Sequence, residues 1–269
     1  MQYRIHYILS FIRDKILTSY CVNTLGMLII TAALGLGSVI AQTADAGDAE
    51  ITIGTKLANM LRASRGVVSA SQPLINNPDV GDKSFTGKNL LSEAETNYVK
   101  RVGSPLLGDD LSARDRRLLE AQKQAMRKVV DGHQDEINQP GVGFKGFIPA
   151  IFARLANEEF GVIAGQEARI RVTAPPDLVR NRKARPDPWE KNILETRLLS
   201  SGWPKGEPFT EEVEYEGRPA FRMLLPEYYQ ESCLSCHGEP SGEMDITNYP
   251  KEGGKAGDLA GAISIVIFK

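Results

Sequence analysis

Cys233-Leu234-Ser235-Cys236-His237 lies between the last two strands that the sequence predicts, and the chain is organised around it. Two cysteines separated by two residues, with a histidine directly after the second, are the attachment signal of a c-type haem. The spacing suits the chemistry, because each thiol adds to one vinyl group and the histidine then binds the iron as proximal ligand. We therefore predict one covalent haem c, with thioethers at Cys233 and Cys236 and His237 on the iron.

A redox-active pair or a zinc site would fit the two cysteines less well. A redox-active Cys-X-X-Cys pair does not need the adjacent histidine. A structural zinc site uses four ligands, usually two spaced pairs, and the sequence has no second cysteine pair. The motif is short, so a chance match stays open at this level.

The N-terminus has the pattern of an export signal. Arg4, Arg13 and Lys15 form a basic start, and an apolar run follows over residues 25–41, ending in small residues at Ala41. We predict that residues 1–41 are a secretory signal peptide and that the mature protein lies in the periplasm. The alternative is an uncleaved anchor, although the run is borderline in length for a membrane span. In that case this segment would be the only contact with the membrane.

Loss of residues 1–41 reduces the number of iron ligands that the chain offers. Of its three histidines and three cysteines, His6 and Cys21 leave with the signal. Removing three basic residues and one acidic residue changes the formal charge from −2 to −4. A basic surface that binds nucleic acid is therefore not expected.

The mature chain offers four methionines, Met60, Met126, Met223 and Met244, and one histidine, His133, for the sixth iron position, and two of these are the main candidates. Met60 comes first, because it lies on the apolar stripe of a predicted helix that must pack against the sheet, and His133 comes second. Their ordinary roles are core packing for the methionine and a helix-end position for the histidine. Water is the third possibility. Arg62, Arg65 and Arg182 are candidate partners of the haem propionates, or else ordinary solvated arginines.

The order of patterns predicts helices first and a small antiparallel sheet after them. Apolar residues at helical spacing indicate helices over residues 50–75, 89–102, 112–132, 147–160 and 187–199. In the fourth of these, Ile151, Phe152 and Leu155 are expected to face inward. Strand patterns follow at residues 168–173, 211–215, 220–225 and 262–268, with a hairpin signal at Glu216-Gly217. Residues 42–269 are therefore expected to form a single α+β domain with the haem motif between two strands.

Several short motifs, taken in order, resemble a known family. They are Arg65-Gly66-Val67-Val68-Ser69, Gly143-Phe144-Lys145-Gly146-Phe147, Arg180-Asn181-Arg182, Cys233 to Gly238, and Gly257-Asp258-Leu259-Ala260-Gly261. Over about residues 50–269 the chain resembles the periplasmic c-type haem domain with a PAS-like fold, found alone or as the sensor part of bacterial histidine kinases. The resemblance implies a PAS-like antiparallel sheet with N-terminal helices and one haem. Some members place an iron-binding cysteine on the first helix, where this chain has only serines.

Three functions are compatible with these features. The resemblance implies a sensor of redox state or of a small gas, which would signal through an unidentified protein partner. An electron-transfer cytochrome c rests on the haem alone, and such carriers are usually smaller. A haem enzyme would need an open sixth site and a distal acid–base group, for which His133 is the only mature histidine left besides His237. We rank them in that order, so catalysis is not the expected role.

Overall fold

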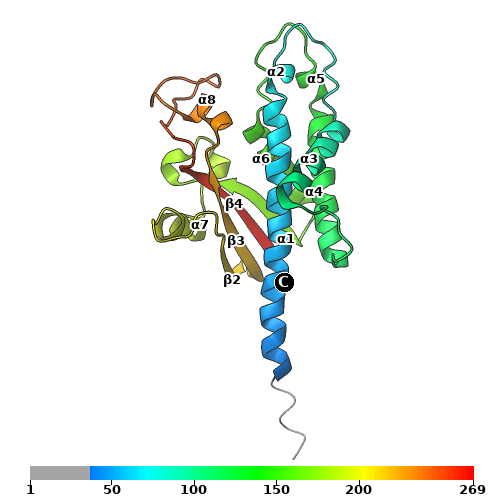
Figure 1. The fold of residues 1–269 in the computed structure, drawn as a ribbon, viewed down its shortest axis with the longest axis vertical. Helices are drawn as coiled ribbons and strands as arrows, with labels where there is room; N and C mark the ends of the chain where they lie inside the picture. The colour runs from blue at the N-terminus through cyan, green and yellow to red at the C-terminus, as the bar shows by residue number, and fades with distance from the viewer. Residues whose placement is uncertain (1–36) are drawn as a thin grey trace, which may run out of the picture. The chain divides into compact units, whose positions relative to one another are not determined.

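The structure, a computed structural model, describes residues 37–269, with side chains from residue 47 onward. The predicted signal peptide, residues 1–41, therefore falls almost entirely outside the described residues. Within residues 37–269, no helix is both long enough and apolar enough to span a bilayer. In Figure 1, α1 (Gly37–Ala70) runs between a helical layer on one side and the sheet on the other.

The order of elements follows the sequence prediction, with helices first and strands later. After α1 come the helices α2 (Gln72–Ile75), α3 (Gly87–Val102), α4 (Ala113–Gly132), α5 (Gln134–Ile137), α6 (Pro149–Ile163), α7 (Pro188–Ile193) and α8 (Leu234–His237). The strands are β1 (Ala168–Thr173), β2 (Phe209–Tyr215), β3 (Arg218–Tyr228) and β4 (Leu259–Phe268). A π-helical turn, Leu194–Leu198, extends α7. The predicted α+β class is confirmed.

The boundaries of the first predicted helix are wrong at both ends. It was expected over residues 50–75, whereas α1 spans Gly37–Ala70. The end follows from Pro73, which has no backbone N–H to continue the hydrogen-bond ladder of α1. The chain instead starts the separate short helix α2, with the proline in its first turn, where that N–H is not needed.

The strands of the described residues form one antiparallel sheet in the order β1-β4-β3-β2. The hairpin between β2 and β3 turns at Glu216 and Gly217, whose φ values are 52° and 74°. Two successive residues with positive φ match the twist of the flanking strands, as the sequence signal predicted. The segment with the two cysteines lies between β3 and β4, also as predicted. The PAS-like assignment within the α+β class stays a prediction.

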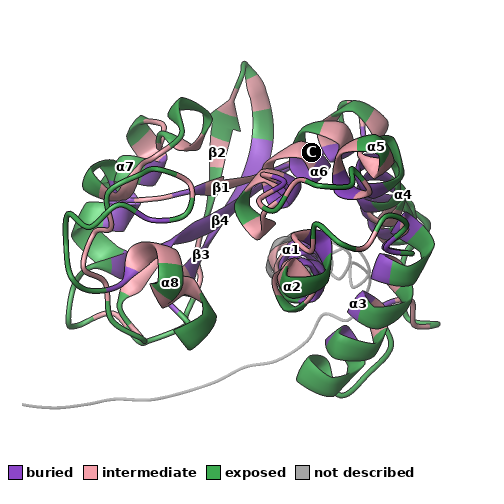
Figure 2. Cartoon of the chain, turned by 90° about the horizontal axis from the view of Figure 1, so that it is seen from above, coloured by how far each residue is buried: buried purple, intermediate pink, exposed green. Residues whose placement is uncertain are grey.

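Side chains of β3 and β4 alternate between two covered faces of the sheet. Phe221, Met223 and Ile265 belong to the core shared with the helices, whereas Leu224 and Ala262 belong to a smaller cluster with α7. Figure 2 shows buried residues along both central strands. This alternation follows from the two-residue period of a strand.

The helical layer shows the cap of α4 and only part of the predicted inward face of α6. Ser112 accepts a hydrogen bond from the backbone N–H of Asp115 at 3.1 Å, which caps α4 as its sequence indicated. On α6, however, Ile151 and Leu155 are only half-buried, and the buried side chains include Phe152, Ala156 and Phe160. The prediction followed the large apolar residues, whereas the buried stripe of α6 contains alanines that allow close helix packing.

Candidate haem site

The two cysteines and the histidine lie on a loop that leaves and re-enters the sheet at one place. We call residues 229–258 the haem loop and residues 233–237 the haem segment. At the base of the loop, the Tyr229 N–H donates to the Asp258 carbonyl at 3.0 Å, and the Gly257 N–H donates to the Tyr229 carbonyl at 2.9 Å. Both ends of the loop are thereby fixed to the end of β3.

The haem segment forms two short helical turns. Glu231–Cys233 is a 3-10 turn, and α8 continues it through Leu234–His237. Cys233 and Cys236 are free thiols and half-buried. The Cys233 sulfur accepts a long hydrogen bond from the Gln230 N–H at 3.4 Å. Both sulfurs are therefore present as unpaired thiols, which is the form that thioether attachment requires.

His237 presents one ring nitrogen to the protein and leaves the other free. Its Nδ1 lies 2.9 Å from Oε2 of Glu252, and Nε2 has no hydrogen-bond partner among the described residues. Burial lowers the pKa of His237 below its ordinary value, and the nearby Arg180 guanidinium acts in the same direction. The neutral imidazole therefore donates Nδ1–H to Glu252, which leaves the lone pair on Nε2. Histidines that bind metals commonly have this carboxylate partner, because it fixes the tautomer and the ring orientation.

The ring of His237 is also held from one side by an aromatic residue. Tyr229 stacks on it with 5.2 Å between ring centroids and 29° between the planes. Gly254 approaches the same place, and its N–H donates to the His237 carbonyl at 2.8 Å. A Cβ on Gly254 would lie 2.5 Å from a ring carbon of Tyr229, so only glycine fits there without a shift of the ring. Burial raises the pKa of Tyr229 to about 12, so its hydroxyl stays protonated at neutral pH.

Arg180 organises the loop behind the histidine. Its guanidinium donates to both carboxylate oxygens of Glu252 at 2.5 and 2.8 Å, to Oδ2 of Asp245 at 2.7 Å and to the Cys236 carbonyl at 2.7 Å. The ring of Tyr249 lies 4.7 Å from the guanidinium carbon. One side chain from the β1–α7 connection thus fixes both the carboxylate partner of His237 and the backbone of the haem segment.

The two carboxylates of this network are ionised. Burial alone would raise the pKa of Glu252, but hydrogen bonds from Arg180 and His237 outweigh it and hold the pKa below its ordinary value. Burial acts the same way on Asp245, and hydrogen bonds from Thr247 and Arg180 hold its pKa well below the usual range. At neutral pH the carboxylates of Glu252 and Asp245 are therefore negative and the guanidinium between them is positive.

This geometry fits a c-type haem better than a site made of protein ligands alone. Within the described part of the chain, no three His, Cys, Asp or Glu side chains converge as a preformed metal site. A haem brings its own four nitrogen ligands, so the protein needs to supply only attachment points and axial donors. Cys233, Cys236 and Nε2 of His237 have the right chemistry for those roles.

The structure brings neither candidate for the sixth ligand into contact with His237. Met60 is fully buried in the core beside α4, where the hydroxyl of Ser64 bonds both the Met60 carbonyl and the sulfur of Met126. Nδ1 of His133 lies 2.7 Å from the Val129 carbonyl. His133 directly precedes α5, and Figures 1 and 2 both place α5 and α8 on opposite sides of α1. The assignment of the sixth ligand stays a prediction.

Sequence reasoning found the motif but missed the residues that orient it. Tyr229, Glu252 and Asp245 had no local signal, because Glu252 lies 15 residues beyond His237 in a loop without periodicity. In the sequence, Arg180 was named only within the motif Arg180-Asn181-Arg182, one of those that resemble the family. Arg62 and Arg65, predicted as propionate partners, both bind the carboxylate of Glu227, at 2.6 and 2.9 Å, at the end of β3.

One family of known proteins matches the chain. A family model described as Tll0287-like matches residues 107–267, which include the haem loop and all of the sheet except the last residue of β4. No curated protein and no solved structure matches the chain. Because the matched residues make up more than half of the chain, it belongs to the Tll0287-like family.

Proposed function

We propose that this chain is an exported c-type haem protein that acts in the periplasm as a sensor domain for redox state or a small gas, through a protein partner. The observation that supports the proposal is the orientation of His237. Its Nδ1 is bound by Glu252 and its Nε2 is free, next to two unpaired thiols at the spacing of haem attachment. Membership of the Tll0287-like family is consistent with this role.

The residues of the haem loop would each have a separate task. Cys233 and Cys236 form the thioethers, and His237 supplies the proximal nitrogen. Glu252 accepts a hydrogen bond from Nδ1–H and fixes the ring, and Arg180 fixes Glu252. When bound, the haem supplies an iron that changes oxidation state or binds a gas.

Covalent attachment is tested on purified, denatured protein. We expect haem absorbance to stay with the polypeptide on a denaturing gel, and Cys233→Ala with Cys236→Ala to abolish it. Ser235→Ala is the matched control, because it changes the same turn without removing a thiol. Haem that extracts freely from the unmutated protein into acidified organic solvent would refute attachment.

Export is tested by the N-terminal sequence of the purified haem-loaded protein. We expect it to begin near Gln42 in a periplasmic fraction, because the small residues at Ala41 form a cleavage pattern. An intact Met1 in a membrane fraction would indicate an anchor instead.

The sixth ligand is tested by visible spectroscopy with and without carbon monoxide. If the sulfur of Met60 binds iron, Met60→Ala abolishes the weak far-red band of the oxidised protein and opens the iron to carbon monoxide. Met126→Ala is the control, because Met126 is equally buried and its removal leaves a comparable cavity. If His133→Ala alone opens the site, histidine is the ligand. Carbon monoxide binding by the unmutated protein would mean that the site is open, which favours a gas sensor over an electron carrier.

A further inference from the structure

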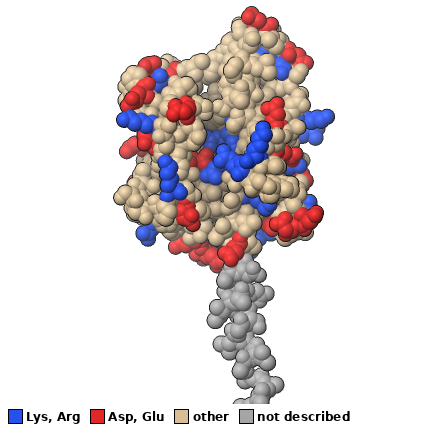
Figure 3. Space-filling view, in the orientation of Figure 1, with Lys and Arg blue, Asp and Glu red and all other residues tan. Residues whose placement is uncertain are grey.

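A basic hollow lies between α1 and α3. It has a volume of about 440 Å³ and is lined by Arg62, Ala63, Gly66, Asn97, Lys100 and Arg101. We call these six residues the basic hollow. Its polar lining consists of three cations and one amide, without a carboxylate. Figure 3 shows Lys and Arg gathered in a depression at the centre of the face on which α1 and α3 lie, in a domain whose net charge is negative.

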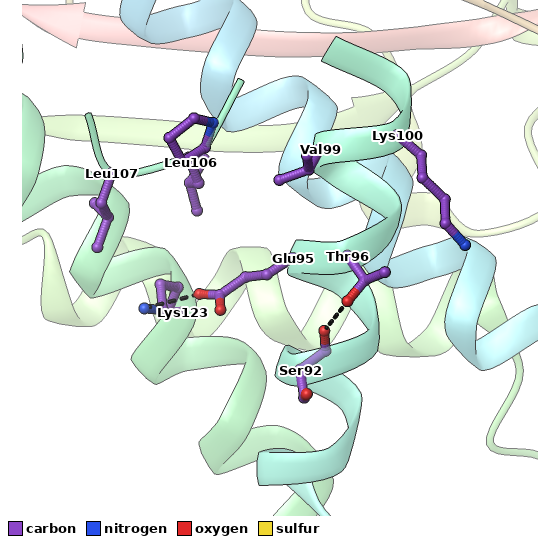
Figure 4. A pocket seen from close by; sticks show the side chains of 9 residues that line it. Ser92, Glu95, Thr96, Val99, Lys100, Leu106, Leu107 and Lys123 are labelled. Atoms are coloured by element: carbon purple, nitrogen blue, oxygen red, sulfur yellow. Dashed lines mark hydrogen bonds and ion pairs between the residues drawn. The ribbon is translucent and has the colours of Figure 1, made fainter. Parts of the chain in front are cut away.

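Two of these cations have no acidic partner in the described part of the chain. Lys100 and Arg101 are exposed, and neither forms an ion pair with a described carboxylate. The neighbouring cavity between α3 and α4, about 650 Å³, is different (Figure 4). There Nζ of Lys123 lies 2.9 Å from Oε1 of Glu95, so its charge is already balanced. The basic hollow is the more suitable place for an anion from outside the chain.

The position of Lys100 and Arg101 at the end of a helix explains only part of the arrangement. Cations in the last turn of α3 are favourable because of the helix dipole. This does not explain Gly66, which lies inside α1, where glycine destabilises a helix by about 0.5–1 kcal/mol relative to alanine. A Cβ on Gly66 would have no atom within 4 Å, so packing does not require glycine there. Gly66 lines the hollow without adding a side chain to it.

Arg62 connects the hollow to the base of the haem loop. Its Nε donates to Oε1 of Glu227 at 2.6 Å, and its Nη2 donates to the Pro226 carbonyl at 3.1 Å. Glu227 lies two residues before Tyr229, which stacks on His237. A haem held by Cys233 and Cys236 would carry two propionates, and unpaired cations of this chain would be suited to hold them.

We propose that the basic hollow binds carboxylate groups through Lys100 and Arg101, with Asn97 as an additional donor, whereas Arg62 is already paired with Glu227. Cationic side chains suit carboxylates, because their hydrogen bonds are charge-assisted. Two sources have this chemistry: the propionates of the haem, in which case the inference rests on the proposed function, and a free dicarboxylate.

The test uses the full-length haem-loaded protein and one double variant. We measure the midpoint reduction potential of the unmutated protein and of Lys100→Gln/Arg101→Gln, and we titrate both with succinate by calorimetry at fixed ionic strength. Lys88→Gln/Arg116→Gln is the control, because it removes the same charge from α3 and α4 outside the hollow. Loss of two charge-assisted contacts should weaken succinate binding by about tenfold or more.

The outcomes separate the two sources and can overturn the proposal. If the hollow binds the propionates, Lys100→Gln/Arg101→Gln lowers the reduction potential, because less positive charge then destabilises the oxidised iron. The control variant leaves the potential unchanged. If it binds a free anion, the potential is unchanged and succinate affinity falls only in the variant of the hollow. If the potential is unchanged and succinate does not bind the unmutated protein, the proposal is wrong. A protein without haem absorbance on the gel would refute the proposed function, while the succinate titration would still test the hollow.

Discussion

The role of Arg180 gives the sharpest prediction about the haem loop. Arg180→Met keeps much of the aliphatic volume of the side chain but removes the guanidinium. Four hydrogen bonds to Glu252, Asp245 and the Cys236 carbonyl are lost together. The side chains of Asp245 and Glu252 are 0% and 12% exposed, so both carboxylates remain as poorly solvated charges. We expect the haem loop to open more often and His237 to lose its fixed orientation.

The size of the effect follows from the burial of the network. Removing one partner of a buried ion pair typically costs about 3–5 kcal/mol. The Arg180 side chain is 18% exposed, so water can partly replace it, and we expect the lower end of that range, about 3 kcal/mol. A change of this size corresponds to a roughly hundredfold increase in the opening equilibrium of the loop. It is smaller than the roughly 5–15 kcal/mol that usually stabilises a domain, so the fold should persist.

Amide hydrogen exchange on the haem-loaded protein measures this opening directly. The reporter is the N–H of Gly254, which donates to the His237 carbonyl inside the loop. Arg154→Met is the control, because Arg154 pairs with Glu158 on the surface of α6, where such a pair is worth about 0.3–0.5 kcal/mol. If Gly254 exchanges no faster in Arg180→Met than in Arg154→Met, the network does not fix the loop and the reasoning fails.

Three further predictions concern stability, each read from urea or thermal unfolding. Gly66→Ala should raise the free energy of unfolding by about 0.5–1 kcal/mol, because glycine destabilises a helix and the added Cβ would meet no atom within 4 Å. Gly87→Ala should lower the free energy of unfolding by about 1–3 kcal/mol, because the added Cβ would lie 2.5 Å from the Arg127 carbonyl oxygen. Equal effects of the two would contradict the packing argument. Arg222→Met should lower it by about 3–5 kcal/mol, since the buried guanidinium binds Asp187 at 2.7 Å; a loss below about 1 kcal/mol would show that the pair adds little. Glu50→Gln should be stabilising at pH 7, because burial raises the pKa of Glu50 and the folded state is penalised for its ionisation above that pKa. This gain should disappear below about pH 4, where the carboxyl is protonated in both states, and a gain independent of pH would contradict a role for burial of the charge.

Local patterns in the sequence were sufficient for most of the fold. The strand at residues 168–173 and the hairpin at Glu216-Gly217 were correct, because two-residue alternation and positive-φ turn residues are local properties. The helix at residues 112–132 was also correct, because its cap and its apolar stripe are both visible in the sequence. The inward face of α6 was only partly correct: Phe152 is buried and Leu155 packs against the core, but the buried alanines were missed, because their burial is set by the helices packed against them.

The site divides in the same way between local and long-range information. The haem segment could be predicted from the sequence, because haem attachment requires two cysteines separated by two residues and a histidine directly after them. Its orientation was not, because Glu252, which binds His237, is held by Arg180 from a different loop, 72 positions away in the sequence. Hydrogen-bond networks between irregular segments leave no periodicity in a sequence, so only a structure shows which carboxylate faces the histidine.

The packing of the sheet explains why the cofactor would lie on a loop. An antiparallel sheet often has one open face, on which a ligand can bind. Here residues 220–226 of β3 and 261–268 of β4 are all buried, so neither face of the central strands is free. The helices cover one face, and on the other α7 is held by Arg222, whose guanidinium carbon lies 4.1 Å from the Trp189 ring. A cofactor of the size of a haem therefore cannot enter between sheet and helices without displacing core side chains. The haem loop instead begins beyond the end of β3, next to Glu227, which binds Arg62 of the basic hollow.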